Sequence, residues 1–172
     1  MLSSDAALFD ACALVINREY GPLEFESENL PWNNTEYYRD EMGDHIIRKF
    51  IFLERLMDPG ELSLIKVFTN NVENSFAARE AGVSRRRINL DPGYIDQAKV
   101  VLATTKDFAH RIYLGGGIYA EVTLRYSNVD RAFIPFDYTY PDYRTDAYRL
   151  LFNKARDSLR SALKGKGKID LE

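Results

Sequence analysis

The spacing of apolar residues predicts the first elements of the chain. The continuous apolar run at residues 12–16 predicts a buried strand. Residues 23–26 alternate between apolar and acidic side chains, which is typical of a half-exposed strand. Residues 46–57 also fit helical spacing, but the bulky run at 50–53 favours a central strand that is covered on both faces.

Helix-start signals follow at residues 58–61. Asp58 can accept from free amides of the first turn, a proline occupies the first helical position, and a glutamate follows where a capping box requires one. The apolar face beyond it predicts a helix near residues 59–77. The same Asp-Pro-Gly signal recurs at residues 91–93 and predicts a second, short helix, with a strand as the alternative for residues 100–104.

Residues 110–126 carry the clearest hairpin pattern in the chain. Two alternating segments flank three glycines at 115–117, which predicts a three-residue loop. This register would place Arg111 opposite Glu121 as a cross-strand ion pair. The residues expected to face the core from the second strand are Ile118, Ala120, Val122 and Leu124.

The end of the chain predicts a strand, a helix and a basic tail. The strand is expected at residues 133–136, the helix over 145–163 and the tail over 164–172. Together these elements predict a single α+β domain over residues 1–172, in which two or three helices pack on a mainly antiparallel sheet.

Composition excludes several classes of protein. A chain of 172 residues with 45% apolar and 28% charged side chains is ordinary for one globular domain. Its longest apolar run is far below the roughly 18 residues of a membrane span. The one cysteine, Cys12, excludes an internal disulfide and a cysteine-rich zinc site. Only His45 and His110 could add imidazole ligands, so no metal site is expected, and no spacing identifies a cofactor.

Charge is distributed unevenly along the chain. Residues 1–60 hold 12 acids and 5 bases, whereas residues 61–172 hold 14 acids and 18 bases. The overall net charge of −3 disfavours general binding to duplex DNA, but the basic second part suits an anionic small molecule or a short RNA segment. The first residues have no basic segment followed by an apolar one, so we expect a cytoplasmic protein.

Cationic side chains before and within the hairpin predict a ligand site. If they converge, five of them would hold an anion: Arg85, Arg87, Lys106, His110 and Arg111. Three others would orient these groups or the ligand: Glu121, Tyr140 and Asp142. His110 is also the candidate for moving a proton near neutral pH. The alternative is that the Arg111–Glu121 pair only fixes the hairpin register and that the arginines lie on a solvated face.

Motifs along most of the chain carry a family resemblance. They lie at residues 35–38, 41–43, 65–66, 69–70, 89–94, 103–107, 110–114, 117–124 and 139–143. Over about residues 10–144 the chain resembles the bacterial and archaeal family catalogued as domain of unknown function 4416. The resemblance implies no established activity, although members are sometimes labelled GTP-binding. The chain lacks the glycine-rich loop ending in Lys-Ser or Lys-Thr that wraps phosphates, so we expect no GTPase of that type.

Two functional hypotheses follow. The first is a cytoplasmic protein that binds, or acts on, an anionic small molecule such as a nucleotide or a phosphorylated metabolite; the residues do not decide whether it is an enzyme. The second is a non-catalytic interaction module, with a homodimer as its simplest form, in which the charged residues are structural salt bridges.

Overall fold

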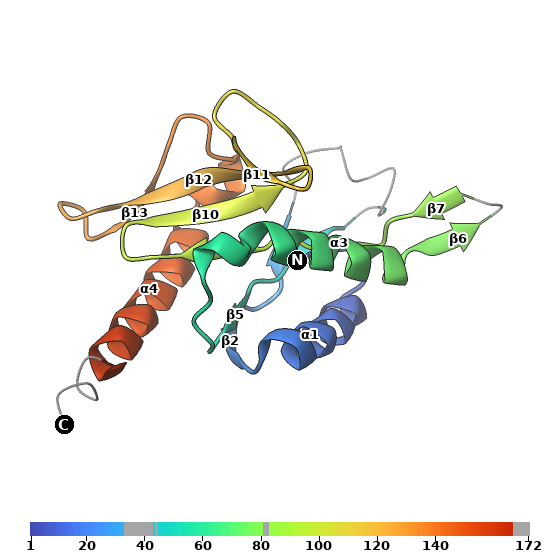
Figure 1. The fold of residues 1–172 in the computed structure, drawn as a ribbon, viewed down its shortest axis with the longest axis horizontal. Helices are drawn as coiled ribbons and strands as arrows, with labels where there is room; N and C mark the ends of the chain where they lie inside the picture. The colour runs from blue at the N-terminus through green and yellow to red at the C-terminus, as the bar shows by residue number, and fades with distance from the viewer. Residues whose placement is uncertain (33–42, 44, 81–82, 167–172) are drawn as a thin grey trace. The chain divides into compact units, whose positions relative to one another are not determined.

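A computed structural model describes residues 1–32, 43, 45–80 and 83–166. The chain divides into two compact units, which we describe separately. Unit 1 comprises Met1–Pro92 and Leu114–Ile118, and unit 2 comprises Gly93–Tyr113 and Tyr119–Glu172. Helices and antiparallel sheets occur together, so the predicted α+β class is confirmed (Figure 1). The prediction of a single domain stays a prediction.

Unit 1 contains a four-stranded antiparallel sheet in the order β3-β4-β1-β8. These strands are β1 (Leu2–Ser3), β3 (Leu30–Pro31), β4 (Ile47–Arg48) and β8 (Ile88–Asn89). Its helical segments are α1 (Ala7–Tyr20), η2 (Pro59–Glu61) and α3 (Leu62–Phe76). Two further antiparallel pairs join β2 (Leu23–Glu26) to β5 (Ile51–Leu53) and β6 (Ala78–Glu80) to β7 (Val83–Arg85). The predicted strand at 23–26 and the helix that follows residue 58 are therefore confirmed. The strand predicted at 50–53 is also present, but it is not the expected central strand covered on both faces, because β5 pairs only with β2 among the described residues and is half-buried.

The core of unit 1 explains why one predicted strand is wrong. Residues 12–16 lie inside α1 rather than in a strand. Phe9, Cys12 and Ile16 are buried at helical spacing, whereas Leu14 points to solvent. The apolar run is continuous only because it covers both faces of the helix, and α1 buries one of them against Val72 and its neighbours.

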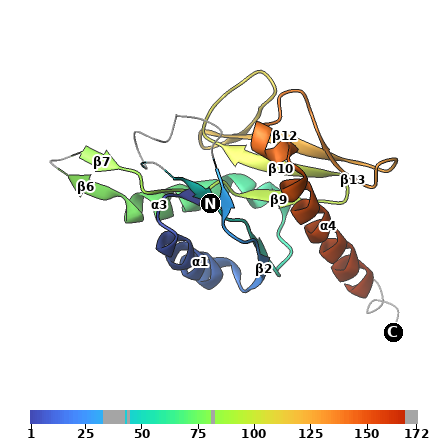
Figure 2. The same cartoon turned by 180° about the vertical axis from the view of Figure 1, so that it is seen from behind.

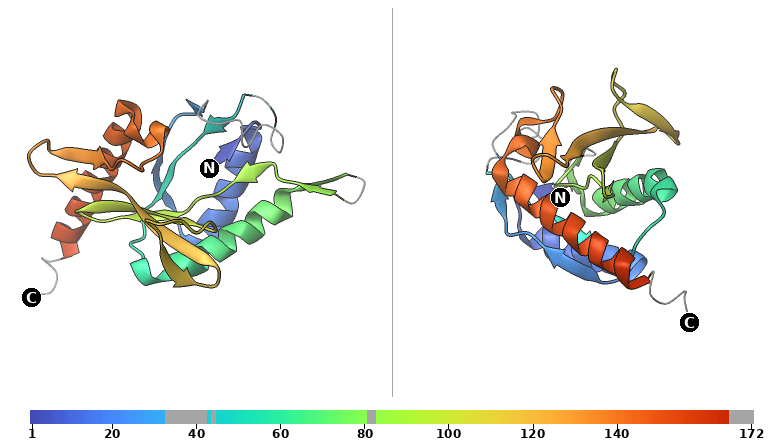
Figure 3. Two further views of the ribbon diagram at one scale, coloured as in Figure 1. Left: turned by 90° about the horizontal axis from the view of Figure 1, so that it is seen from above. Right: turned by 90° about the vertical axis from the view of Figure 1, so that its left-hand side faces the viewer.

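Unit 2 is built on a sheet in the order β11-β12-β10-β9, with β13 also paired to β12. The strands are β9 (Gly93–Ile95), β10 (Lys99–Thr104), β11 (Ile112–Gly115), β12 (Ile118–Ser127) and β13 (Ala132–Pro135). The tip of the β11–β12 hairpin is grouped with unit 1. The segment η3 (Pro141–Arg144) leads into α4 (Asp146–Lys166), which packs against β13 (Figure 3).

The expected helix after Asp91 is wrong, and the alternative strand is correct. β9 and β10 form an antiparallel pair in which Gly93 lies opposite Leu102 (Figure 2). A Cβ atom at Gly93 would lie 2.4 Å from the carbonyl oxygen of Val101, so this close approach of two strands requires glycine. The Asp91 carboxylate bonds to Lys66 and Asn89 instead of capping a helix.

The hairpin and the C-terminal helix are confirmed with changed boundaries. The hairpin turn has two residues rather than three, because Gly115 ends β11 and only Gly116 and Gly117 connect the strands. Both have positive φ, at 60° and 76°, as a tight turn between twisted strands requires. The C-terminal helix continues to Lys166, so residues 164–166 of the expected tail are helical, and residues 167–172 lie outside the described part.

Among the residues that the structure describes, no helix combines the length and the apolar character needed to cross a membrane.

Candidate functional site

The loop of residues 105–111, between β10 and β11, is held in place by Arg111. The backbone N–H of Arg111 donates to the carbonyl oxygen of Phe108 at 2.9 Å, and its guanidinium Nη1 donates to the carbonyl oxygen of Lys106 at 2.9 Å. At the start of the loop, the N–H of Lys106 donates to Oγ1 of Thr104 at 3.2 Å. One arginine side chain therefore fixes a turn of its own loop.

Glu121, on β12, is the charged centre of this site. Its Oε2 accepts from Nε of Arg111 at 2.8 Å and lies 3.2 Å from Nε2 of His110. The predicted ion pair of Arg111 with Glu121 is therefore confirmed, but the expected register is not its cause, because Arg111 lies in the loop before β11. Alternation along β12 predicts that Glu121 faces away from the core, yet its side chain is only 3% exposed.

The residues after β13 cover this second face of β12. The hydroxyl of Tyr138 donates to the carbonyl oxygen of Val122 at 3.0 Å, and Oγ1 of Thr139 donates to that of Thr123 at 2.7 Å. Burial and then the negative charge of Glu121 raise the pKa of Tyr138, so its hydroxyl keeps the proton that it donates. β12 is thus covered on both faces where it carries Glu121. Of the predicted core positions, Ile118, Ala120 and Leu124 are buried, whereas Val122 is only half-buried.

The contacts of His110 define its tautomer. An ionised carboxylate only accepts hydrogen bonds, so the ring nitrogen facing Glu121, Nε2, carries a proton. In the neutral ring, Nδ1 is then the acceptor. The imidazole also stacks on the ring of Tyr138, with centroids 4.1 Å apart and planes at 13°. Its orientation is therefore fixed by one carboxylate and one aromatic ring, which is what a positioned acid or base needs.

Acceptors within the protein use most of the hydrogen-bonding capacity of the Arg111 guanidinium. Its side chain is only 7% exposed, and its third contact is from Nη2 to the hydroxyl oxygen of Tyr140 at 3.2 Å. Burial alone would lower the pKa of Arg111, but hydrogen bonds and charge from Glu121 and Tyr140 raise it overall. Arg111 is therefore a positioning group whose charge is balanced within the site.

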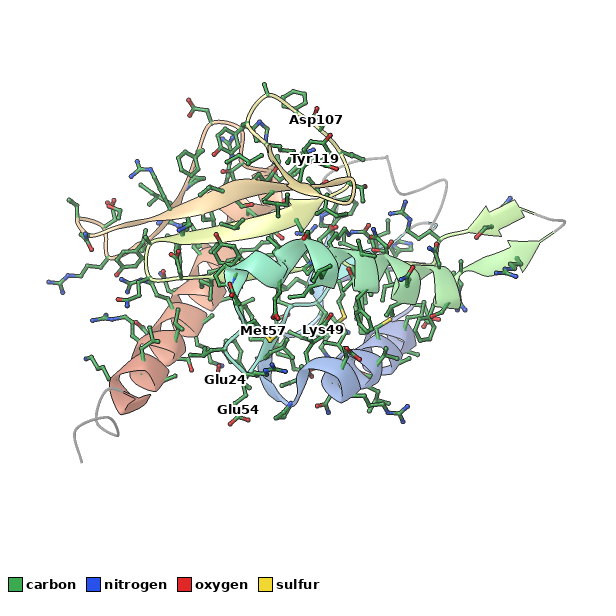
Figure 4. All side chains as sticks on the ribbon, in the orientation of Figure 1. Glu24, Lys49, Glu54, Met57, Asp107 and Tyr119 are labelled. Atoms are coloured by element: carbon green, nitrogen blue, oxygen red, sulfur yellow. The ribbon has the colours of Figure 1, made fainter. Side chains whose placement is uncertain are left out.

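Tyr140 and Lys106 bring polar groups to the outer side of the same network. The Tyr140 oxygen accepts from Arg111, so its own hydrogen can be donated elsewhere, and the side chain is 47% exposed. The Lys106 residue is also exposed, and its backbone anchors Arg111. Asp107 lies on the same loop, as Figure 4 shows.

The remaining predicted site residues are Asp142, Arg85 and Arg87, and each has its own surroundings. Asp142 is buried in η3, where its Oδ1 accepts from the N–H of Tyr143 at 3.1 Å. Arg85 is exposed on β7 of unit 1. Arg87 also belongs to unit 1 and pairs with Asp5 at 2.9 Å. Unit 2 therefore brings together His110, Arg111, Glu121, Tyr140 and the backbone of Lys106, whereas the bond of Asp142 to Tyr143 lies outside that network and the two arginines belong to the other unit.

A second polar cluster lies in unit 1, and the sequence reasoning missed it. The ammonium of Lys66 is buried and donates to the carbonyl oxygen of Leu90 at 2.6 Å and to Oδ1 of Asp91 at 3.0 Å. It also lies 3.6 Å from Oε1 of Glu73, which accepts from the N–H of Leu90 at 2.7 Å. The signal was available, because Lys66 and Glu73 share the buried face of α3 with Leu62, Thr69 and Val72.

The two carboxylates of this cluster respond differently to the same lysine. Burial raises the pKa of Glu73, and the charge of Lys66 and the Leu90 hydrogen bond offset this only in part. Burial would also raise the pKa of Asp91, but the charge and hydrogen bond of Lys66 lower it overall. The cluster thus joins α3 to the end of β8 through charges within unit 1. Within the described residues, histidine, cysteine and acidic side chains form no group of three that could hold a metal ion.

Comparison with known proteins identifies one family. A family model described as a domain of unknown function (DUF4416) matches residues 1–159 of the chain. The match covers the range of the sequence resemblance and extends into α4. No curated protein and no solved structure matches the chain.

Proposed function

The chain belongs to the DUF4416 family, whose description names no activity, and we propose from its own side chains that it binds an anionic small molecule, such as a nucleotide or a phosphorylated metabolite, at the loop of unit 2. The observation that carries this proposal is the Glu121-centred network of His110 and Arg111, which fixes a loop that presents cationic and hydrogen-bonding groups.

Different members of the network would have different tasks. Lys106 would supply positive charge, and Tyr140 would donate its hydroxyl hydrogen to a phosphate or carboxylate oxygen. His110 would contact the ligand through the Nδ1 side of its ring. Arg111 and Glu121 neutralise each other and would act as positioning residues, because most of their polar atoms already have protein partners.

A thermal-shift screen of nucleotides, phosphorylated sugars and divalent metals tests the proposal. We expect a stabilised unfolding transition with at least one phosphorylated compound, because a ligand that binds only the folded state raises its stability by mass action. Lys106→Gln should weaken that stabilisation, whereas the matched change Lys164→Gln, on the exposed end of α4, should not. Equal responses of the two variants, or no stabilisation by any phosphorylated compound, would contradict anion binding at this loop.

An interaction module is the second candidate, and a specific observation favours it. Arg111 is satisfied by protein acceptors, while Ile112 and Tyr113 on β11, the terminal strand of the sheet, are 69% and 59% exposed. A second copy of the chain could pair with such an edge. Sedimentation analysis of the wild type and Ile112→Lys separates the two functions. A dimer that the variant abolishes, together with no phosphate response, would favour the module.

We further propose that the protein works in the cytoplasm. Its one thiol, Cys12, is buried in unit 1, and burial raises its pKa to about 11, so it is a poor nucleophile. Oxidising compartments stabilise proteins through disulfides, and a chain with one buried thiol forms no internal disulfide. Recovery of the protein with an extracytoplasmic fraction on cell fractionation would overturn this location.

A further inference from the structure

Phe108 is an exposed aromatic ring on a loop whose backbone is fixed. The residue is 64% exposed, yet its carbonyl oxygen accepts from the N–H of Arg111 at 2.9 Å. The carbonyl of Lys106, two residues earlier, is held by the same arginine. A single exposed apolar side chain is ordinary. A rigidly mounted one, however, loses little backbone entropy when it binds a ligand.

Phe108 is the first of four aromatic rings that contact one another in succession. Its ring centroid lies 5.2 Å from that of His110, with the planes at 60°. His110 stacks on Tyr138, and Tyr138 stacks on Phe136 with centroids 5.1 Å apart and planes at 4°. The four rings therefore form a continuous aromatic row, in which Tyr138 is tied to β12 by its hydroxyl. Phe108 ends this row and is more exposed than Tyr138 within it, at 64% against 38%, so its ring is the more accessible of the two to a ligand.

Polar residues share the loop that carries the exposed end of the row. Lys106 and Asp107 directly precede the ring in the chain, and the Tyr140 hydroxyl is joined to the same loop through Arg111. A purely apolar partner would have to desolvate these charges, which disfavours a hydrophobic protein surface as the occupant. A compact ligand with one flat ring and one anionic end satisfies both features.

We propose that the anionic ligand of unit 2 carries a planar aromatic ring, as a nucleotide does, and that this ring stacks on Phe108 while the phosphate meets Lys106 and Tyr140. The inference rests on the proposed function and narrows its class of ligand. A phosphorylated sugar supplies the anion but has no aromatic ring that could stack on Phe108. Stacking of a base on an aromatic side chain contributes enough to change affinity by about fivefold to a hundredfold.

Calorimetric titration with nucleoside 5′-monophosphates, ribose 5-phosphate and inorganic phosphate tests the ring. We expect at least one nucleotide to bind at least about fivefold more tightly than ribose 5-phosphate. Phe108→Leu keeps an apolar side chain and should remove that advantage without changing ribose 5-phosphate affinity, whereas Phe108→Trp should retain it. Tyr113→Leu, which removes another exposed ring of unit 2, is the matched control and should leave the advantage intact.

Variants of Lys106 and Asp107 distinguish anion binding from ring stacking on Phe108. Lys106→Gln should lower the affinities for nucleotides and for ribose 5-phosphate by the same factor. Asp107→Asn should raise both affinities, because it removes a negative charge from the loop. Ribose 5-phosphate binding as tightly as every nucleotide, or a nucleotide advantage that survives Phe108→Leu, would overturn the ring inference while leaving anion binding in place. If neither nucleotides nor the two simpler phosphates bind, the proposed function fails and the inference fails with it.

Discussion

Replacing Lys66 by methionine should strongly destabilise unit 1. The side chain is only 4% exposed, and Met fills a similar volume without the ammonium. The change removes the donor to the Leu90 carbonyl and leaves the buried carboxylate of Glu73 beside one fewer positive charge. Loss of one partner from a buried ion pair costs about 3–5 kcal/mol. That is a large share of the roughly 5–15 kcal/mol by which a domain is stable.

The destabilisation of unit 1 can be measured through the fluorescence of a single tryptophan. Trp32 is the one tryptophan, and it is buried in unit 1 with Leu2 and Ile46. Urea unfolding followed by its fluorescence should therefore report on unit 1. With a slope of about 1–3 kcal/mol per molar urea, Lys66→Met should lower the midpoint by about 1 M or more.

A double-mutant cycle tests the reason for the loss. Glu73→Gln keeps an oxygen that can accept from the Leu90 N–H but removes the buried negative charge. In the Lys66→Met background, Glu73→Gln should cost at least about 1 kcal/mol less of the free energy of unfolding than it does in the wild type. The reason is that the ammonium with which the Glu73 charge interacts is already absent. A Lys66→Met midpoint within error of the wild type, or strictly additive costs, would refute the assignment of a coupled buried pair.

Three further changes test the fold and its charges. Gly93→Ala should destabilise unit 2 by about 1–3 kcal/mol, because the added methyl meets the Val101 backbone, and denaturation followed by circular dichroism should show it. Gly117→Ala should cost about 1–2 kcal/mol in the same measurement, because its φ of 76° is left-handed. Asp91→Asn should lower stability at neutral pH, with a difference that shrinks in acid. The folded-state pKa of Asp91 is lowered, so its contribution is present above the ordinary aspartate pKa near 3.8 and is lost as the pH falls through the folded value.

Controls for these changes come from the same chain. Gly165→Ala introduces a methyl with no atom within 4 Å, inside α4, and should not destabilise the protein. Asp58→Asn changes an exposed side chain that caps η2 by accepting from the Gly60 N–H, so at neutral pH it should cost less stability than Asp91→Asn. A cost for Gly165→Ala as large as that for Gly93→Ala would show that steric contact is not the cause at Gly93.

Local signals predicted the elements whose residues act on their neighbours in sequence. Asp58 bonds to the N–H of Gly60, two residues later, and the glycine turn joins adjacent strands. Such contacts need no information from the rest of the chain. The same reasoning failed for the second Asp-Pro-Gly, because Asp91 has a partner 25 residues away in Lys66 and Gly93 faces another strand. A local helix signal was thus overridden by contacts that the local pattern does not contain.

The sequence by itself determined the α+β class and the β11–β12 hairpin, because strand alternation and a glycine turn are local signals. It also named Arg111 and Glu121 as partners, but the folded chain brings them together from the loop before β11 rather than through the expected strand register. Only the tertiary structure decided that Glu121 is buried, that His110 is held between it and Tyr138, and that Lys66 carries a charge into the core of unit 1. Burial depends on which distant segment covers a strand or helix face. The alternation of a strand gives its two faces, but the loop that covers the second one is chosen by the folded chain.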